Sequence, residues 1–194
     1  MVDVTPSASE VYERLMACAA PAADPADRHA LACIIATALA DNDHPLTESL
    51  GLDRRTLARL LGSIFPGACV LDDLVATDAG AGQDAIEEAD FRTMLLDGRR
   101  NGSEVEEWIA RIVVRRSLRA GHLWTSLGLR TRKELSDLLH RHFPALAERN
   151  TRGMRWKKFF YREMCQAEGI YLCKSPICDL CQDFNECFKP DDSP

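Results

Sequence analysis

The sequence contains no long apolar run, and this absence excludes proteins that cross a membrane on helices. No stretch approaches the roughly 20 consecutive apolar residues that a bilayer-spanning helix needs. The first residues, MVDVTPS, are acidic and lack the apolar core of an export signal. We therefore expect a cytoplasmic protein that has no membrane partner and keeps its thiols reduced.

The sequence also lacks the short motifs of conventional catalytic sites. It contains no Gly-x-Ser-x-Gly nucleophile elbow, no Gly-x4-Gly-Lys phosphate-binding loop and no His-Glu-x-x-His zinc motif. We therefore do not expect an enzyme with a conventional catalytic site.

Positive charge is scarce in the first half of the chain. Residues 1–98 carry 6 basic and 17 acidic side chains, whereas residues 99–194 carry 18 basic and 13 acidic ones. This balance excludes a basic surface along the whole chain, so we expect no nucleic-acid partner. Two interpretations of the asymmetry stay open: two solvated faces of opposite sign, or a C-terminal half that handles an anionic ligand.

The remaining composition is that of an ordinary globular protein, with 46% hydrophobic and 28% charged residues among 194. A domain of this length buries enough surface to fold without disulfides or metals. Apolar residues recur at three- and four-residue steps and no convincing period-two alternation is present, so we predict an all-α fold. Helices are expected near residues 25–39, 53–66, 84–96, 103–121, 135–142 and 153–167.

Two segments of the chain resemble each other at an offset of 77 or 78 residues. We infer a duplicated helix–loop–helix unit, with pseudo-repeats at about 31–67 and 109–145 that pack as a pseudo-symmetric pair. The matching positions of the two copies are Leu50-Gly51-Leu52 and Leu127-Gly128-Leu129, Phe65-Pro66 and Phe143-Pro144, and His44 and His122.

These patterns suggest how the chain is organised. We expect a single helical domain over residues 25–172, preceded by a partly flexible helix or linker over 1–24. A metal-cluster loop at 173–188 and a tail at 189–194 follow. Three isolated cysteines lie in apolar stretches, and we assign them to the core as small hydrophobic residues: Cys18, Cys33 and Cys69.

Four of the eight cysteines fall within 15 residues near the end of the chain. They have the spacing Cys173-x4-Cys178-x2-Cys181-x5-Cys187. A two-residue spacing lets neighbouring thiolates bind one inorganic core from a single turn. Pro176 stiffens the loop, so less entropy is lost on ligation. Four thiolates this close together can surround a compact cluster without further ligands.

Three interpretations of this cysteine cluster compete. The first is an iron–sulfur cluster, because the first three cysteines have the plant-type ferredoxin spacing C-x4-C-x2-C. The nearby fourth cysteine then favours a compact cubane over a two-iron cluster. The second is a structural zinc ion, although such sites usually offer two short knuckles and this chain has one. The third is four unrelated thiols, which this density disfavours in a cytosolic protein. We favour the iron–sulfur cluster.

The residues around the cysteines form a longer recognisable pattern. It reads MRWKKFFYREMC from Met154, EGIYLCKSPICDLC from Glu168, and CF at Cys187. This pattern closely resembles the NifQ family, whose C-x4-C-x2-C-x5-C spacing is present without departure. The resemblance is most specific over residues 150–188 and extends more loosely to 122–129 and 50–67.

The resemblance implies a molybdenum carrier in the maturation of the iron–molybdenum cofactor of nitrogenase. The family is associated with an iron–sulfur cluster, 3Fe-4S or 4Fe-4S, that accepts molybdenum to give a Mo-Fe3-S4 species. The implied partners are a molybdenum donor, dinitrogenase reductase and the cofactor assembly scaffold. By the same resemblance, the cluster ligands are Cys173, Cys178, Cys181 and Cys187.

Residues beside the cysteine loop are candidates for supporting roles. Cys165 and His122 are candidate additional ligands, with a buried neutral thiol and a capping or packing histidine as the alternatives. Trp156, Phe160 and Met164 recur at four-residue steps, so we expect them to dock their helix on the core. Four cations are candidate stabilisers of an anionic cluster or of molybdate, with a solvated helix face as the alternative: Arg155, Lys157, Lys158 and Lys174.

Two other classes of function compete with the carrier. One is a helical DNA-repair-type protein that contains an iron–sulfur loop, and the other is a zinc-stapled interaction module. Repair glycosylases have a longer first cysteine spacing and need a Gly-rich helix–hairpin–helix beside a catalytic Asp, which we do not find. The acidic first half also disfavours wrapping DNA.

Overall fold

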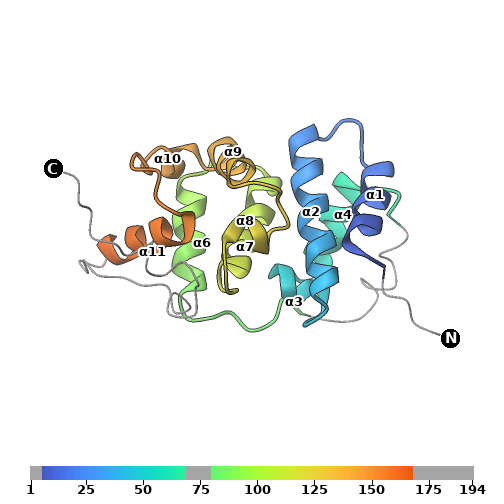
Figure 1. Ribbon diagram of the computed structural model, residues 1–194, viewed down its shortest axis with the longest axis horizontal. Helices are drawn as coiled ribbons and strands as arrows, with labels where there is room; N and C mark the ends of the chain where they lie inside the picture. The colour runs from blue at the N-terminus through green and yellow to red at the C-terminus, as the bar shows by residue number, and fades with distance from the viewer. Residues whose placement is uncertain (1–5, 69–79, 168–194) are drawn as a thin grey trace.

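The computed structural model describes residues 6–68 and 80–167, and within them all regular structure is helical (Figure 1). The predicted all-α class is therefore confirmed for this part of the chain. The helices are α1 (Ala8–Ala17), α2 (Pro25–Asp41), α3 (Leu46–Leu50), α4 (Arg54–Ile64), α6 (Glu88–Asp97), α7 (Glu104–Ser117), α8 (Leu123–Ser126), α9 (Arg132–His142), α10 (Pro144–Ala147) and α11 (Trp156–Ala167).

Local capping explains where several helices begin. The Asp53 carboxylate accepts a hydrogen bond from the Thr56 amide at 2.7 Å and starts α4. Ser103 and Glu106 form the capping box that starts α7, since each side chain binds the other residue's amide. An equivalent box that starts α1 at Ser7 is a helix start that the sequence analysis did not specify.

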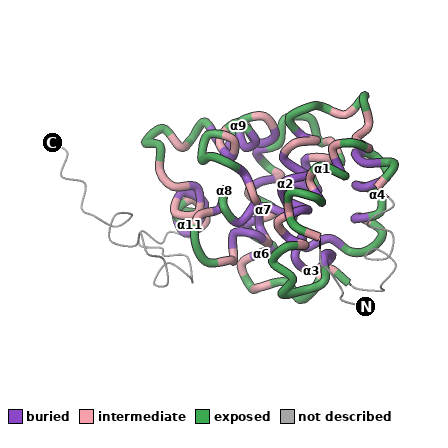
Figure 2. Tube along the Cα trace, turned by 45° about the vertical axis from the view of Figure 1, so that its right-hand side comes forward, coloured by how far each residue is buried: buried purple, intermediate pink, exposed green. Residues whose placement is uncertain are grey.

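Helices α2 and α7 form the centre of the molecule. In α7, Ile109, Ile112 and Val113 are fully buried, and α2 contributes a run of buried aliphatic residues from Ala30 to Ala36. Helix α7 contacts α3, α4, α6 and α8, whereas α2 contacts α1, α3 and α9. The tube in Figure 2 shows this buried interior between the two helices. Each aliphatic side chain of this kind stabilises the fold by about 1.5–3 kcal/mol.

The two segments predicted to be copies have matching local geometry. Helices α4 and α9 contain 11 residues each, and they end at Phe65 and Phe143 with nearly the same backbone angles, φ −131° and −129°. Gly51 caps the end of α3, and Gly128 follows the cap residue of α8. Both glycines have a left-handed backbone conformation, with φ 64° and 67°. Local geometry thus repeats at the offset that the sequence suggests.

The two copies also contact each other reciprocally. A Cβ atom on Gly51 would lie 3.2 Å from Cβ of Arg115 in α7, and one on Gly128 would lie 2.7 Å from the Cys33 carbonyl oxygen in α2. Each glycine therefore lets its loop approach the long helix of the other unit. These contacts support a pseudo-symmetric pair, while duplication of the complete unit stays a prediction.

The isolated cysteines differ from the prediction in part. Cys33 is buried as expected, and desolvation, with the charge of Glu134, raises the pKa of its thiol to about 11. Cys18 is only half-buried, because it follows the last turn of α1 and hydrogen-bonds to the Arg14 carbonyl there. Cys69 lies outside the described residues.

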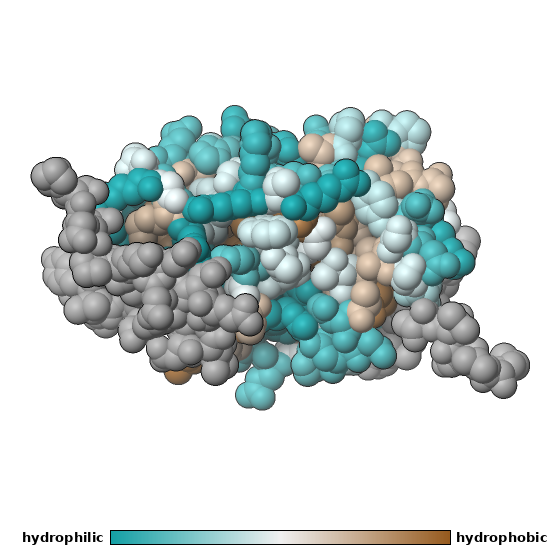
Figure 3. Space-filling model, viewed as in Figure 1, coloured by the Kyte–Doolittle hydropathy of each residue, from teal (hydrophilic) through white to brown (hydrophobic). Residues whose placement is uncertain are grey.

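The described surface mixes hydrophilic and apolar residues, as the face in Figure 3 shows. Ile86, 96% exposed, is the one large apolar side chain that is exposed within residues 6–68 and 80–167. In the same ranges, no helix is both long and apolar enough to pass through a bilayer.

Candidate functional site

The four cysteines that the sequence analysis selects as cluster ligands lie outside the described residues, as does Lys174. Their donor chemistry fits an iron–sulfur cluster, because four cysteine thiolates are the usual ligand set of such clusters. Within residues 6–68 and 80–167, no group of three or more His, Cys, Asp and Glu side chains is arranged to hold a metal ion. The C-terminal cysteines therefore remain the chain's candidate metal ligands.

Helix α11, which precedes the cysteine segment, is docked firmly on the rest of the protein. Trp156 and Phe160 are buried, and the Phe160 ring lies 5.0 Å from the ring of Phe91 in α6, measured between centroids. The Trp156 indole N–H donates to the Ser136 hydroxyl of α9 at 2.9 Å. Met164 is partly buried against the same core. The predicted docking stripe is thus confirmed.

The two candidate ligands outside the cysteine loop, Cys165 and His122, belong to different helices. Cys165 is buried in α11 with 7% of its surface exposed. His122 is half-buried at the start of α8, where its ring stacks on Trp124 with 6.2 Å between centroids. His44, at the equivalent position of the other unit, lies 3.6 Å from a Glu48 carboxylate oxygen. A metal-binding role for Cys165 or His122 stays a prediction.

The candidate cations in and just before α11 are half-buried and do not form a fully solvated face. Arg155, Lys157 and Lys158 are each partly covered. The Lys157 ammonium donates a hydrogen bond to the Arg119 carbonyl, just beyond the end of α7. A cation at this position satisfies a carbonyl that the helix leaves unpaired. Lys157 therefore ties α11 to α7, a role that the sequence pattern did not reveal.

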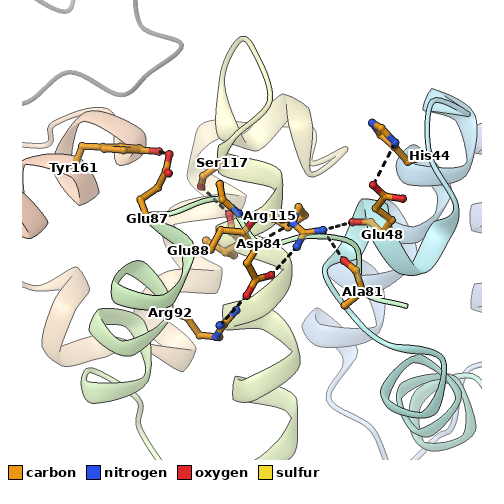
Figure 4. Close-up of polar contacts among 12 residues, drawn as sticks. His44, Glu48, Ala81, Asp84, Glu87, Glu88, Arg92, Arg115, Ser117 and Tyr161 are labelled. Atoms are coloured by element: carbon orange, nitrogen blue, oxygen red, sulfur yellow. Dashed lines mark hydrogen bonds and ion pairs between the residues drawn. The ribbon is translucent and has the colours of Figure 1, made fainter. Parts of the chain in front are cut away.

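A buried arginine of α7 connects three segments of the acidic first half (Figure 4). Arg115 donates through Nε to Glu88 at 3.0 Å and through Nη2 to Asp84 at 2.9 Å. Its Nη1 donates to the carbonyls of Glu48 and Ala81 at 2.7 and 2.6 Å. The Arg115 and Glu88 side chains are 11% and 2% exposed. This guanidinium has a partner at each nitrogen and acts as a structural bridge.

The next two arginines along the chain extend this pairing. Arg116, whose side chain is 1% exposed, donates to the Asp41 carboxylate at 2.6 Å and to the Ser126 carbonyl at 2.7 Å. Burial lowers the pKa of the Arg116 guanidinium, and the Asp41 carboxylate opposes that shift. Arg119 donates to Asp43 at 2.6 Å. Second-half cations therefore neutralise first-half carboxylates at the end of α2.

A third ion-pair cluster joins the start of α2 to the end of α9. Asp27 Oδ1 lies 2.8 Å from His142 Nε2 and accepts from Arg141 Nε at 2.9 Å. Burial would raise the pKa of Asp27, but the hydrogen bond and charge of His142, with those of Arg141, outweigh it and hold the pKa below its usual value. The charge asymmetry of the sequence thus appears here as pairing between halves, and not as separate solvated faces.

Ligand-sized cavities are present among the described residues. A polar cavity of about 470 Å³ lies beside Arg115, between His44 and Gln83. A groove of about 440 Å³ between α6 and α11 contains Met94 and Met164. A smaller cavity of about 150 Å³ lies on α11 near Arg162. Sequence spacing could not predict the first two cavities, because each is formed by segments that are distant along the chain, whereas the third is lined by residues 149–166 alone.

Comparison with known proteins gives one consistent result. A protein-family model described as NifQ matches residues 30–189. The chain is 40% identical to "Protein NifQ homolog" of Sinorhizobium fredii over 169 residues, which cover 84% of this chain and 71% of the relative. It is 41% identical to "Protein NifQ" of Azotobacter vinelandii, with 72% of this chain and 76% of the relative covered. "Protein NifQ" of Rhodobacter capsulatus is 43% identical, with 76% and 79% covered. No solved structure matches the chain.

Proposed function

The chain belongs to the NifQ family, and on this premise we propose that it serves nitrogen fixation as a molybdenum carrier. In this proposal an iron–sulfur cluster, bound by Cys173, Cys178, Cys181 and Cys187, takes up molybdenum. The protein then donates the metal to assembly of the iron–molybdenum cofactor, through dinitrogenase reductase and the assembly scaffold. It is a carrier and donor and carries out no conventional catalysis.

The observation that carries this proposal is the position of the four cysteines within the family match. The match extends to residue 189 and therefore includes all of them. A single C-x2-C pair with two more thiols within 15 residues suits a compact cluster better than a zinc ion. When bound, the cluster supplies sulfide ligands, which are soft and suit reduced molybdenum.

Helix α11, which precedes the cysteine segment, supports the proposal through its attachment to the core and its charge. Helix α11 is fixed by its aromatic contacts to α6 and α9, and by the Lys157 hydrogen bond to the end of α7. The cysteine segment therefore follows a helix that these contacts attach to the core. Cations on this helix favour anionic ligands nearby, which is the electrostatic environment that a thiolate-bound cluster and molybdate both require.

The proposal is tested by elemental analysis of protein prepared without oxygen. Wild-type protein should be brown, contain iron and sulfide, and retain molybdenum after incubation with molybdate. Cys181→Ala should lose stable iron binding, because it breaks the one two-residue chelate. Cys18→Ala is the matched control, since it removes a half-buried thiol at the end of α1 and should leave metal content unchanged.

Other outcomes of the same measurements identify the competing functions. A colourless protein with one zinc ion per chain would replace the carrier with a zinc-stapled interaction module. Tight binding to duplex DNA at physiological salt would favour a repair-type protein. Wild-type protein that binds neither iron nor sulfide under these conditions would refute the proposed function.

A further inference from the structure

A small cavity of about 150 Å³ lies between α11 and the loop that follows α10. Three arginines line it, namely Arg149, Arg152 and Arg162, and one carboxylate, that of Glu163. The buried ring of Phe159 forms part of the same lining. The cavity therefore combines a net excess of positive charge with room for a few water molecules or one small anion.

Arg162 has donors to spare for such an anion. Its side chain is exposed, and the hydrogen bond that the structure gives it goes from Nη1 to the Met154 sulfur at 3.5 Å. A thioether sulfur is a weak acceptor, and a guanidinium has five N–H donors. This commitment is much smaller than that of Arg115, which has a partner at every nitrogen.

Arg149 and Glu163 form an ion pair at this cavity. The Glu163 side chain is 10% exposed and pairs with Arg149, which is 60% exposed. Glu163 therefore offsets the charge of Arg149, and the guanidinium of Arg162 keeps its positive charge. A carboxylate this close to an anion site also weakens anion binding by repulsion, and this effect gives the site a measurable signature.

The loop that forms the other wall is rigid. The Asn150 side chain donates to the Met154 carbonyl at 2.9 Å and accepts from the Met154 amide at 2.8 Å. These two reciprocal bonds close the turn before α11 and fix the cavity wall. A site with fixed walls loses less entropy when it binds a ligand.

From these contacts we propose that the cavity binds a tetrahedral dianionic oxyanion, with the guanidinium of Arg162 as its main ligand. Guanidinium groups bind pairs of oxygen atoms on such anions with two parallel hydrogen bonds. The choice of molybdate among these anions rests on the proposed function. Arg162 lies on α11, the helix that directly precedes the cysteine segment along the chain.

Binding of molybdate alone to the iron-free full-length chain tests this assignment. Equilibrium dialysis should show one saturable site, and Arg162→Gln should weaken binding about tenfold, which corresponds to about 1.4 kcal/mol. Arg54→Gln is the matched control, because it removes the same charge from the surface of α4, at the opposite end of the molecule (Figure 1). Glu163→Gln should tighten binding several-fold, because it removes the repulsive charge.

Competing anions and iron-loaded protein separate the remaining outcomes. Sulfate or phosphate that displaces molybdate at equal concentration would overturn the choice of molybdate. Unsaturable binding, or equal affinities of the wild type and Arg162→Gln, would overturn the site itself. If Arg162 binds molybdate but the iron-loaded protein never retains molybdenum, the site stands and the carrier function fails. If Arg162→Gln does not weaken molybdate binding but the iron-loaded protein retains molybdenum, the site is refuted and the carrier function stands.

Discussion

Replacing Gly128 by alanine should destabilise the protein strongly, because two separate costs act at this position. The backbone has φ 67°, which costs a residue with a Cβ atom about 1–2 kcal/mol. The new Cβ would also collide with the Thr37 hydroxyl and lie 2.7 Å from the backbone carbonyl oxygen of Cys33, which cannot rotate aside. Overpacking of this kind costs about 1–3 kcal/mol. The expected total is about 2–5 kcal/mol.

Two other glycines provide a graded comparison. Gly121 has φ 80° but nothing within 4 Å of an added Cβ, so Gly121→Ala should show the backbone cost alone, about 1–2 kcal/mol. Gly51 has φ 64° and a nearest contact of 3.2 Å to Cβ of Arg115, so its alanine variant should fall between the other two. The entropy that alanine removes from the unfolded chain affects all three variants alike.

Urea unfolding of the iron-free proteins measures this order. Midpoints should fall in the sequence Gly121→Ala, Gly51→Ala, Gly128→Ala, with the same slope against urea for all variants. A change in slope would indicate an altered unfolded state. If Gly128→Ala is no less stable than Gly121→Ala, the reciprocal contact between the two units does not constrain the fold, and the reasoning from it is wrong.

The ion pairs between the two halves give two further predictions. Asp41→Ala leaves the buried Arg116 guanidinium without its carboxylate and should lower the free energy of unfolding in urea by about 3 kcal/mol. The control Asp137→Ala removes an exposed ion pair and should lower it by under about 1 kcal/mol. Equal losses in the two variants would contradict the buried bridge. His142 and Arg141 lower the pKa of Asp27 in the folded protein. The ion pairs of the Asp27 carboxylate therefore stabilise the fold at pH values above its unfolded-state pKa of about 3.9. This stabilisation is lost as the pH falls through the folded-state pKa. Thermal unfolding should therefore show wild type losing more stability than Asp27→Asn below about pH 5, and parallel pH profiles would argue against the pairing.

Sequence reasoning succeeded where the controlling interactions are local. The helical class follows from the three- and four-residue periodicity, and the start of α7 follows from Ser103 and Glu106, which are three residues apart. Boundaries were less accurate: α6 begins at Glu88 and not near Asp84, because Asp84 binds Arg115 from the segment before the helix. The docking stripe of α11 was correct because its spacing is that of one helix face.

The remaining features depend on partners that the spacing cannot identify. Arg115 binds the Glu48 carbonyl, 67 residues away, and Arg116 binds Asp41, 75 residues away. The charge counts showed an acidic excess in the first half and a basic excess in the second, but they did not show that these charges form ion pairs with each other. Lys157 looked like one cation among several until its contact with Arg119 placed it at the end of α7. The cysteine ligands stay a sequence-based prediction, since they lie outside the described residues.

Pairing between the halves has a consequence for how the chain is synthesised. On the ribosome, the acidic half emerges before Arg115, Arg116 and Arg119 have been translated, so its carboxylates repel one another and stay hydrated. Helix α2 likewise lacks α9, which holds Asp27, until residue 142 has appeared. The nascent first unit therefore lacks these stabilising ion pairs until the second unit has been translated, and we expect its native structure to be completed late.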